Sequence, residues 1–250
     1  MRRGILALTC CISGLLFAAS ASAAPVSPVE LGIFIGGVYD SSYDETDLGC
    51  AAGPGDTFVC TSPVGGLTVG DLKLDNWNMT FDNDPVITGV TAVTNLNLIS
   101  SVQFTMVFTL PTGPIGPSTL TGGSVQGGMT DNTGDDATVS TATGSAFYQG
   151  LIDGVSDPAR TLYADPQSFS AGGAFLSGNI PSTAFGTPIP SLPSPAVAGN
   201  IGIRLDFILT PGDSASFTSN FVVVVPEPAT GALVALGLVV LAAHRRRASA

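Results

Sequence analysis

Histidine and basic side chains are scarce in this sequence. Its only histidine, His244, lies close to the C-terminal end. The residues before it therefore offer no Ser-His-Asp triad, no histidine-ligated zinc and no imidazole base. Catalysis by paired carboxylates needs two groups that face each other, whereas Asp135 and Asp136 are adjacent in a turn. The sequence therefore predicts a protein that is not an enzyme, with no catalytic residues, no bound metal and no cofactor.

Positive charge is concentrated at the two ends of the chain. Five of the eight basic residues are Arg2, Arg3 and Arg245–Arg247, and residues 24–225 hold only Lys73, Arg160 and Arg204. The same segment holds 18 of the 19 acidic residues, which gives it a net charge of −15. Such a surface repels phosphate backbones and anionic lipid, so we expect no nucleic-acid partner.

The N-terminal residues have the pattern of a secretory signal peptide. Met1-Arg2-Arg3 is a basic start, residues 4–19 are apolar, and Ala21-Ser22-Ala23 is a small-x-small cleavage pattern. Cleavage is expected after Ala23, with Ala24 as the second choice. We therefore assign residues 1–23 to a signal peptide and residues 24–225, about 200 residues, to an extracellular domain.

Cysteine is equally sparse. Cys10 and Cys11 belong to the predicted signal peptide, which leaves Cys50 and Cys60 in the domain. An even pair in an oxidising compartment favours a disulfide, and the turn-forming residues 53–56 lie between the two cysteines. We predict that a Cys50–Cys60 disulfide closes a small loop or hairpin, with about 3 kcal/mol of stabilisation. Two free thiols are the alternative.

Amphipathic helical patterns are missing before the tail, and apolar residues instead alternate with polar ones. This period of two predicts half-buried strands. A change of parity between Leu74 and Trp77 predicts a β-bulge near Asp75-Asn76. The predicted strands are Leu72–Phe81, Val102–Leu110, Ile201–Leu209 and Ala215–Val225, with further candidates at Glu30–Tyr39, Val86–Thr94, Leu120–Met129, Thr138–Ala142 and Ala146–Ile152.

These strands predict an all-β, antiparallel β-sandwich that is jelly-roll-like, because many short strands alternate with turn signals. Turns are expected at Asn83–Pro85 and Pro211–Asp213. Residues 165–198 are rich in glycine, serine and proline. We expect them to form a long surface loop with one short strand near Phe175 and an extended segment over residues 188–195.

The C-terminal 25 residues combine three elements. Pro226, Glu227 and Pro228 come first, with Thr230 close behind, then an uncharged apolar run to Ala243, then Arg245, Arg246 and Arg247. As a helix, residues 229–243 would be roughly 23 Å long, short of the ~30 Å hydrocarbon core, but arginine stems can snorkel across part of the difference. We predict a single transmembrane helix over 229–243, with the basic tail 244–250 on the cytoplasmic side. A buried core helix is the alternative, and the arginines and the lack of an amphipathic stripe disfavour it.

This tail resembles the PEP-CTERM sorting signal of Gram-negative bacteria. The resemblance rests on the Pro-Glu-Pro motif over 226–230, the apolar span and the basic cluster within 226–250. It implies that exosortase, a membrane-embedded protease-like transpeptidase, is a partner and cuts in or near residues 226–230. It also implies export across the inner membrane, a transient membrane anchor, and a final place at the cell surface or in the matrix, linked to exopolysaccharide and biofilm. A structural or interaction role is the expected function.

Two binding functions are alternatives, as is a permanent C-terminal anchor without processing. Calcium ligands are available in Tyr39–Asp47 and in Asp131–Asp136, although solvated Asx-turn loops also explain both. A glycan platform would need exposed aromatic side chains, and the candidates are Tyr39, Tyr43, Trp77, Tyr148 and Tyr163. Among these five, we expect Trp77 in the core and Tyr39 and Tyr43 at the surface.

Overall fold

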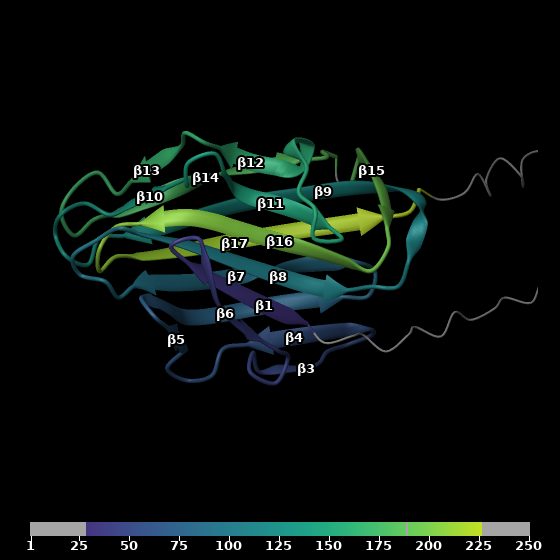
Figure 1. The fold of residues 1–250 in the computed structure, drawn as a ribbon, viewed down its shortest axis with the longest axis horizontal. Coiled ribbons are helices and arrows are strands. Elements are labelled where there is room, and N and C mark those ends of the chain that lie inside the picture. The colour runs from purple at the N-terminus through teal and green to yellow at the C-terminus, as the bar shows by residue number, and fades with distance from the viewer. Residues whose placement is uncertain (1–28, 189, 227–250) are drawn as a thin grey trace, which may run out of the picture.

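Strands make up nearly all of the regular structure (Figure 1). The computed structural model describes residues 29–188 and 190–226. Its elements in chain order are β1 Glu30–Ile35, β2 Val38–Tyr43, β3 Cys50–Ala52, β4 Thr57–Thr61, β5 Leu67–Val69, β6 Leu72–Asp82, β7 Val86–Asn95, β8 Val102–Pro111, β9 Ile115–Thr130, β10 Thr138–Ser140, β11 Ala146–Ile152, the 3-10 helix η1 Pro158–Arg160, β12 Thr161–Ala164, β13 Ser168–Ser170, β14 Ser177–Phe185, β15 Leu192–Val197, β16 Asn200–Leu209 and β17 Ser214–Val224.

The strands form two sheets. Sheet A has the order β12-β11-β16-β8-β1-β2, and β10 and β13 extend it beside β16. Sheet B has the order β14-β9-β17-β7-β6-β4-β3, with β15 beside β9 and β5 beside β6. Neighbouring strands are antiparallel throughout the described pairings, for example β16 with β8 and β17 with β7. The predicted all-β antiparallel class is therefore confirmed.

The two sheets share one core, which the alternating strands build from both sides. Phe207 of β16 in sheet A contacts Phe217 of β17 in sheet B, with ring centroids 4.8 Å apart. Phe147 of β11 packs edge-on against Phe217 at 5.1 Å. The phenol of Tyr148 donates a hydrogen bond of 2.6 Å to the Asn220 carbonyl across the core. Each strand sends every second side chain inward, so the apolar side chains of the two sheets meet and fill the interior between them.

A β-bulge interrupts β6 where the sequence predicts it. The pairing of β6 with β7 shifts register between Leu74 and Asn76. On one side of the shift Leu72 and Leu74 are buried, and on the other side Trp77 and Met79 are buried. The extra residue thus allows both apolar sets to face the same core although their parity differs.

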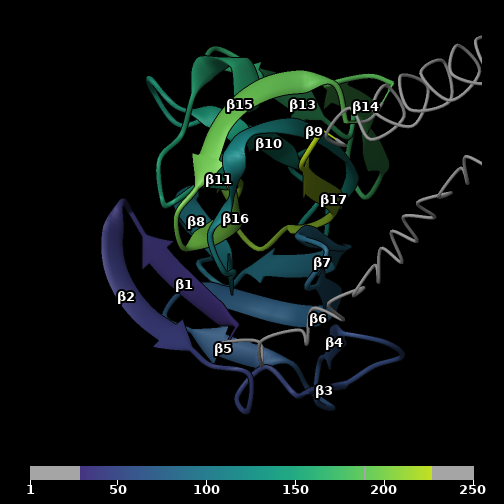
Figure 2. The ribbon, with the colours of Figure 1, turned by 90° about the vertical axis from the view of Figure 1, so that its right-hand side faces the viewer.

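The expected single strand Glu30–Tyr39 is wrong, because the chain turns back in its middle. β1 and β2 form a hairpin around Gly36 and Gly37, whose φ angles are +59° and +78°. Two consecutive residues with positive φ suit a tight hairpin turn, and glycine adopts this conformation without steric cost. Figure 2 shows this hairpin on the side of the molecule away from β15.

The expected long loop over residues 165–198 is also wrong. This segment contains β13, β14 and β15, of which β14 and β15 both pair with β9. Phe175 lies in the turn before β14, with a φ of +56° and 69% exposure, rather than in a strand. β14 and β15 bury few residues, so their apolar alternation is weak. The extended segment predicted over 188–195 is confirmed from Leu192 onward.

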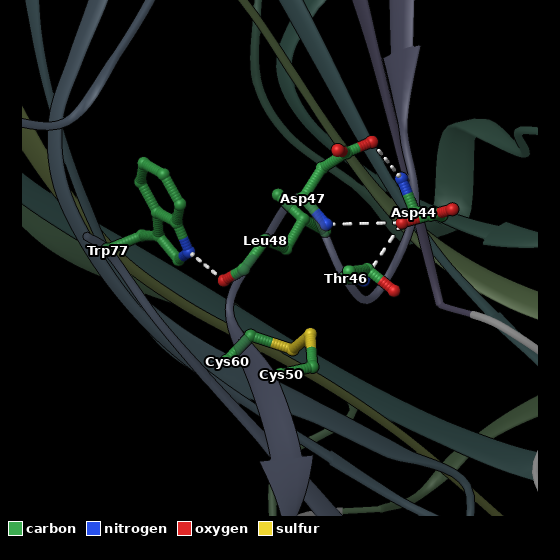
Figure 3. The surroundings of a disulfide bond; sticks show 7 residues. All are labelled: Asp44, Thr46, Asp47, Leu48, Cys50, Cys60 and Trp77. Atoms are coloured by element: carbon green, nitrogen blue, oxygen red, sulfur yellow. Dashed lines mark hydrogen bonds between the residues drawn. A yellow bond between two sulfur atoms is a disulfide. The ribbon is translucent and has the colours of Figure 1, made fainter.

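The predicted disulfide is present and closes a hairpin (Figure 3). Cys50 of β3 lies opposite Cys60 of β4, and β4 pairs with β6. The buried Trp77 of β6 donates its indole N–H to the Leu48 carbonyl at 3.0 Å. The disulfide and this hydrogen bond together attach the loop before β3 to the edge of sheet B.

Replacing both cysteines by serine is expected to lower the free energy of unfolding by about 3 kcal/mol, because the unfolded chain regains the entropy of an open loop. Urea denaturation of the oxidised protein and the double variant measures the difference. A reducing agent should bring the wild type to the stability of the variant and leave the variant unchanged. Equal stability of the two oxidised proteins would contradict this role of the disulfide.

Candidate functional site

The junction between the folded domain and the tail lies at the end of β17. This strand is central in sheet B and pairs with β9 on one side and with β7 on the other. Its last residue is Val224, and the exposed Val225 and Pro226 follow directly. In Figure 1 the arrow of β17 ends at the right-hand side of the molecule. Because both neighbours hold β17 by backbone hydrogen bonds, the chain leaves the domain from a firmly fixed point.

An apolar cleft of about 320 Å³ opens beside this junction. We call it the junction cleft. Three separate segments form it, and the Val223 N–H donates to the Pro85 carbonyl at 3.0 Å between two of them. The methyl groups of Val225 lie over Gly116, where a Cβ atom would come within 3.3 Å of them. The cleft is lined by Asp84, Pro85, Ile115, Val223, Val224 and Val225.

Comparison with protein-family models gives the decisive observation at this end of the chain. Residues 224–247 match the PEP-CTERM protein-sorting motif. The matched range contains the predicted motif and basic residues Pro226, Glu227, Pro228, Thr230, Arg245, Arg246 and Arg247, and it ends before residues 248–250 of the predicted tail. A search of the curated proteins finds no match to this sequence.

The PEP-CTERM motif supports export of the protein and sorting by exosortase, and it implies exosortase as the processing partner. It indicates a transient membrane anchor before processing. Of the residues predicted for the sorting signal, only Pro226 lies within the part of the chain that the structure describes. The other predicted features lie outside the described residues: the signal peptide 1–23, Glu227, Pro228, Thr230, the predicted helix 229–243 and the basic tail 244–250. Within residues 29–188 and 190–226, no helix is long and apolar enough to cross a membrane.

At the other end of β17, away from Val224, three acidic side chains come together. Carboxylate oxygens of Asp131, Asp135 and Asp213 lie within 4.8 Å of one another. The sequence placed Asp131 and Asp135 in one loop but did not connect Asp213, which comes from the turn before β17. Nothing in the spacing could join them, because 82 residues separate Asp131 from Asp213.

Asp131 is almost fully buried, and the backbone of two loops satisfies its carboxylate. Its Oδ1 accepts hydrogen bonds from the N–H groups of Thr133 and Gly134, at 3.0 and 2.7 Å. Its Oδ2 accepts from Asp136 at 3.2 Å and from Phe175 at 2.7 Å. Burial raises the pKa of Asp131, but these four N–H groups outweigh burial and hold the pKa far below its ordinary value. The carboxylate thus fastens the turn before β14 to the loop after β9.

The other acidic groups also bind donors of the chain itself. Asp213 accepts from the Asn132 N–H at 3.0 Å and from the Thr210 hydroxyl at 2.6 Å. Asp136 accepts from the N–H groups of Gly172 and Gly173. In the first acidic loop, Asp44 accepts from the N–H groups of Thr46 and Asp47 (Figure 3). The Asp44 contacts have Asx-turn geometry, whereas those of Asp213 and Asp136 link separate segments of the chain, so these carboxylates hold the two loops in place.

The predicted aromatic candidates do not lie on one surface. Trp77 and Tyr148 are buried, with 3% and 0% exposure, which confirms the prediction for Trp77. Tyr163 is half-buried and donates its hydroxyl to the Pro181 carbonyl. Tyr39 is 56% exposed and meets Phe34 edge-on, while Tyr43 is half-buried. Only Tyr39 thus offers a largely exposed ring among these five residues.

Exposed apolar side chains gather at the loop end of the domain, opposite the end at which β17 finishes. Phe175 packs over Gly134, where a Cβ atom would lie 2.6 Å from its ring. Leu98 lies beside Gly212, which also adjoins Thr133. The sequence does not reveal this group, because its members come from different turns. The exposed side chains are Leu98, Ile99, Phe175 and Leu176.

Proposed function

We propose that this chain is an exported surface or matrix protein of a Gram-negative bacterium, which exosortase sorts and processes. Its β domain has a structural or interaction role linked to exopolysaccharide and biofilm. The observation that carries the proposal is the position of the PEP-CTERM motif, whose match begins at Val224, the last residue of β17. A complete folded domain therefore precedes the motif directly, as a sorted cargo requires.

Three further observations support this function. The Cys50–Cys60 disulfide suits an oxidising compartment outside the cytoplasm. The acidic, histidine-free domain contains few groups for acid–base chemistry. Of the adjacent carboxylates Asp135 and Asp136, Asp136 binds backbone N–H groups of the chain itself. Both facts favour a protein without enzymatic activity. We also propose that the two sheets form a jelly-roll-like sandwich and that residues 1–23 are a cleaved signal peptide.

Cell fractionation of strains with and without exosortase tests the proposed route. With exosortase, the protein should leave the inner membrane and appear at the cell surface or in the medium. Without exosortase it should stay with the inner membrane. The variant Glu227→Ala should behave in the exosortase-containing strain like the wild type in the deficient strain, because it removes the charge of the Pro-Glu-Pro motif.

Glu30→Ala is the matched control, since Glu30 is exposed in β1 and lies outside the matched residues. This variant should be sorted normally. If the wild type remains in the inner membrane of both strains, the chain is a permanently anchored protein and the proposal is wrong.

A further inference from the structure

The junction cleft is so close in the chain to the PEP-CTERM motif that an enzyme cannot bind the motif without also meeting the cleft. Six residues separate Val224 from Thr230, and six extended residues span at most about 20 Å. A folded protein of ordinary size is wider than this distance. Any enzyme that binds residues 226–230 in an active site must therefore touch the end of the domain from which β17 emerges.

The end of β17 cannot readily unpair to lengthen the chain between the domain and Thr230. Val222 pairs with Val86 of β7 and with Gly122 of β9, and Val224 still pairs with Leu120. The Val223 side chain is 1% exposed. Releasing these residues would break backbone hydrogen bonds on both sides of a central strand and expose a core side chain. The domain therefore presents its junction end to the enzyme in the folded form.

The surface at the junction end of the domain is suited to contact with a protein partner. The junction cleft has an apolar lining from Pro85, Ile115 and Val223–Val225, and the exposed Asp84 lies at its edge. Val225 is 43% exposed, although it directly precedes Pro226 of the motif. An apolar hollow with one acidic group fits an apolar side chain of a partner that carries a basic residue or another hydrogen-bond donor nearby.

We infer that the junction cleft is a second docking site for exosortase, which binds the folded end of the domain together with the sorting motif. This inference rests on the proposed function, because it names a further contact of the same processing partner. The contact involves Asp84, Pro85 and Ile115, which lie outside the residues matched by the motif. Exosortase thereby favours cargo whose domain is folded up to the end of β17, since three distant segments form the cleft only after folding.

The test compares the rates at which four chains are processed in an exosortase-containing strain. They are the wild type, Ile115→Ser, a chain with twelve Gly/Ser residues inserted between Val225 and Pro226, and the combination of both changes. Pulse labelling followed by intact mass gives the rate of tail removal. Ile115→Ser should slow processing about tenfold, the effect of about 1.4 kcal/mol of lost binding. The insertion uncouples the motif from the cleft, so in that chain Ile115→Ser should change the rate less than twofold.

Two further variants separate docking from stability. Ile99→Ser makes the same chemical change at the far loop end, where Ile99 is 90% exposed, and should be processed at the wild-type rate. Asp84→Lys reverses the charge at the edge of the cleft without removing a buried group, and should slow processing even if Ile115→Ser lowers the melting temperature. Wild-type rates for both Ile115→Ser and Asp84→Lys overturn the inference.

The outcomes also distinguish this inference from the proposed function. If the wild-type chain is not processed, the proposed function is wrong, and the docking site with it. If the wild type is processed and the cleft variants are processed at the same rate, only the inferred docking site is wrong. If Ile115→Ser instead weakens binding of the full chain to vesicles of phosphatidylethanolamine and phosphatidylglycerol, the cleft contacts lipid, which also overturns the inference.

Discussion

Replacing Phe217 by alanine is expected to lower the free energy of unfolding by about 4 kcal/mol. Phe217 is 1% exposed and contacts Phe147 and Phe207 of the opposite sheet. Truncation leaves a cavity between two sheets whose hydrogen-bonded strands cannot collapse into it, so the lost transfer energy and the cavity term add. Urea denaturation followed by the fluorescence of Trp77, the single tryptophan, measures the change.

Phe175→Ala is the matched control for this substitution. It removes the same atoms from a side chain that is 69% exposed in the turn before β14. Its effect should stay within about 0.5 kcal/mol. If Phe217→Ala costs no more than Phe175→Ala, the two sheets do not share the aromatic core described above.

Replacing Asp131 by asparagine is expected to lower the melting temperature by about 10 °C at neutral pH. An amide has one oxygen acceptor where the carboxylate has two, so its NH₂ group would face backbone N–H groups of Asp136 and Phe175 or of Thr133 and Gly134. The buried donors left without an acceptor account for the loss. Thermal unfolding of the two proteins measures it, and Asp40→Asn, at an exposed position in β2, should leave the melting temperature unchanged.

The pH dependence of the Asp131→Asn effect has a definite sign. The pKa of Asp131 is lowered in the folded protein, so its carboxylate stabilises the fold at every pH above the ordinary value of 3.8. As the pH falls below 3.8, the unfolded chain takes up the proton first and this stabilisation declines. The difference in melting temperature between wild type and variant should therefore shrink below pH 4. An equal difference at pH 3 and pH 7 would contradict the assigned role of the carboxylate.

The sequence predicts best those strands that lie in the middle of the sheets. β8, β16 and β17 bury alternate side chains on one face, so their apolar residues recur with period two. Even the bulge in β6 follows from this rule, because the change of parity between Leu74 and Trp77 must be absorbed by one extra residue. The disulfide was predictable for a different reason, since only one cysteine pair remains in the exported domain.

The errors occur where burial on one face is incomplete. β14 exposes most of its residues, so polar side chains hide its alternation. In the expected strand Glu30–Tyr39, the apolar pattern continues past Gly36-Gly37, but the positive φ angles of these glycines reverse the chain. The contact of Asp213 with Asp131 and the junction cleft were beyond sequence reasoning, because each joins segments far apart in the chain, and only the completed sheet brings them together.

The most direct test of processing by exosortase is the intact mass of the mature protein from cells with and without exosortase. We expect the chain from exosortase-containing cells to lack the residues after about 230, including Arg245–Arg247, whereas the chain from deficient cells should retain them. In both strains the mass should show the Cys50–Cys60 disulfide as a loss of two hydrogens. A mass that retains Arg245–Arg247 in both strains would contradict processing by exosortase, and the tail would then be a permanent anchor.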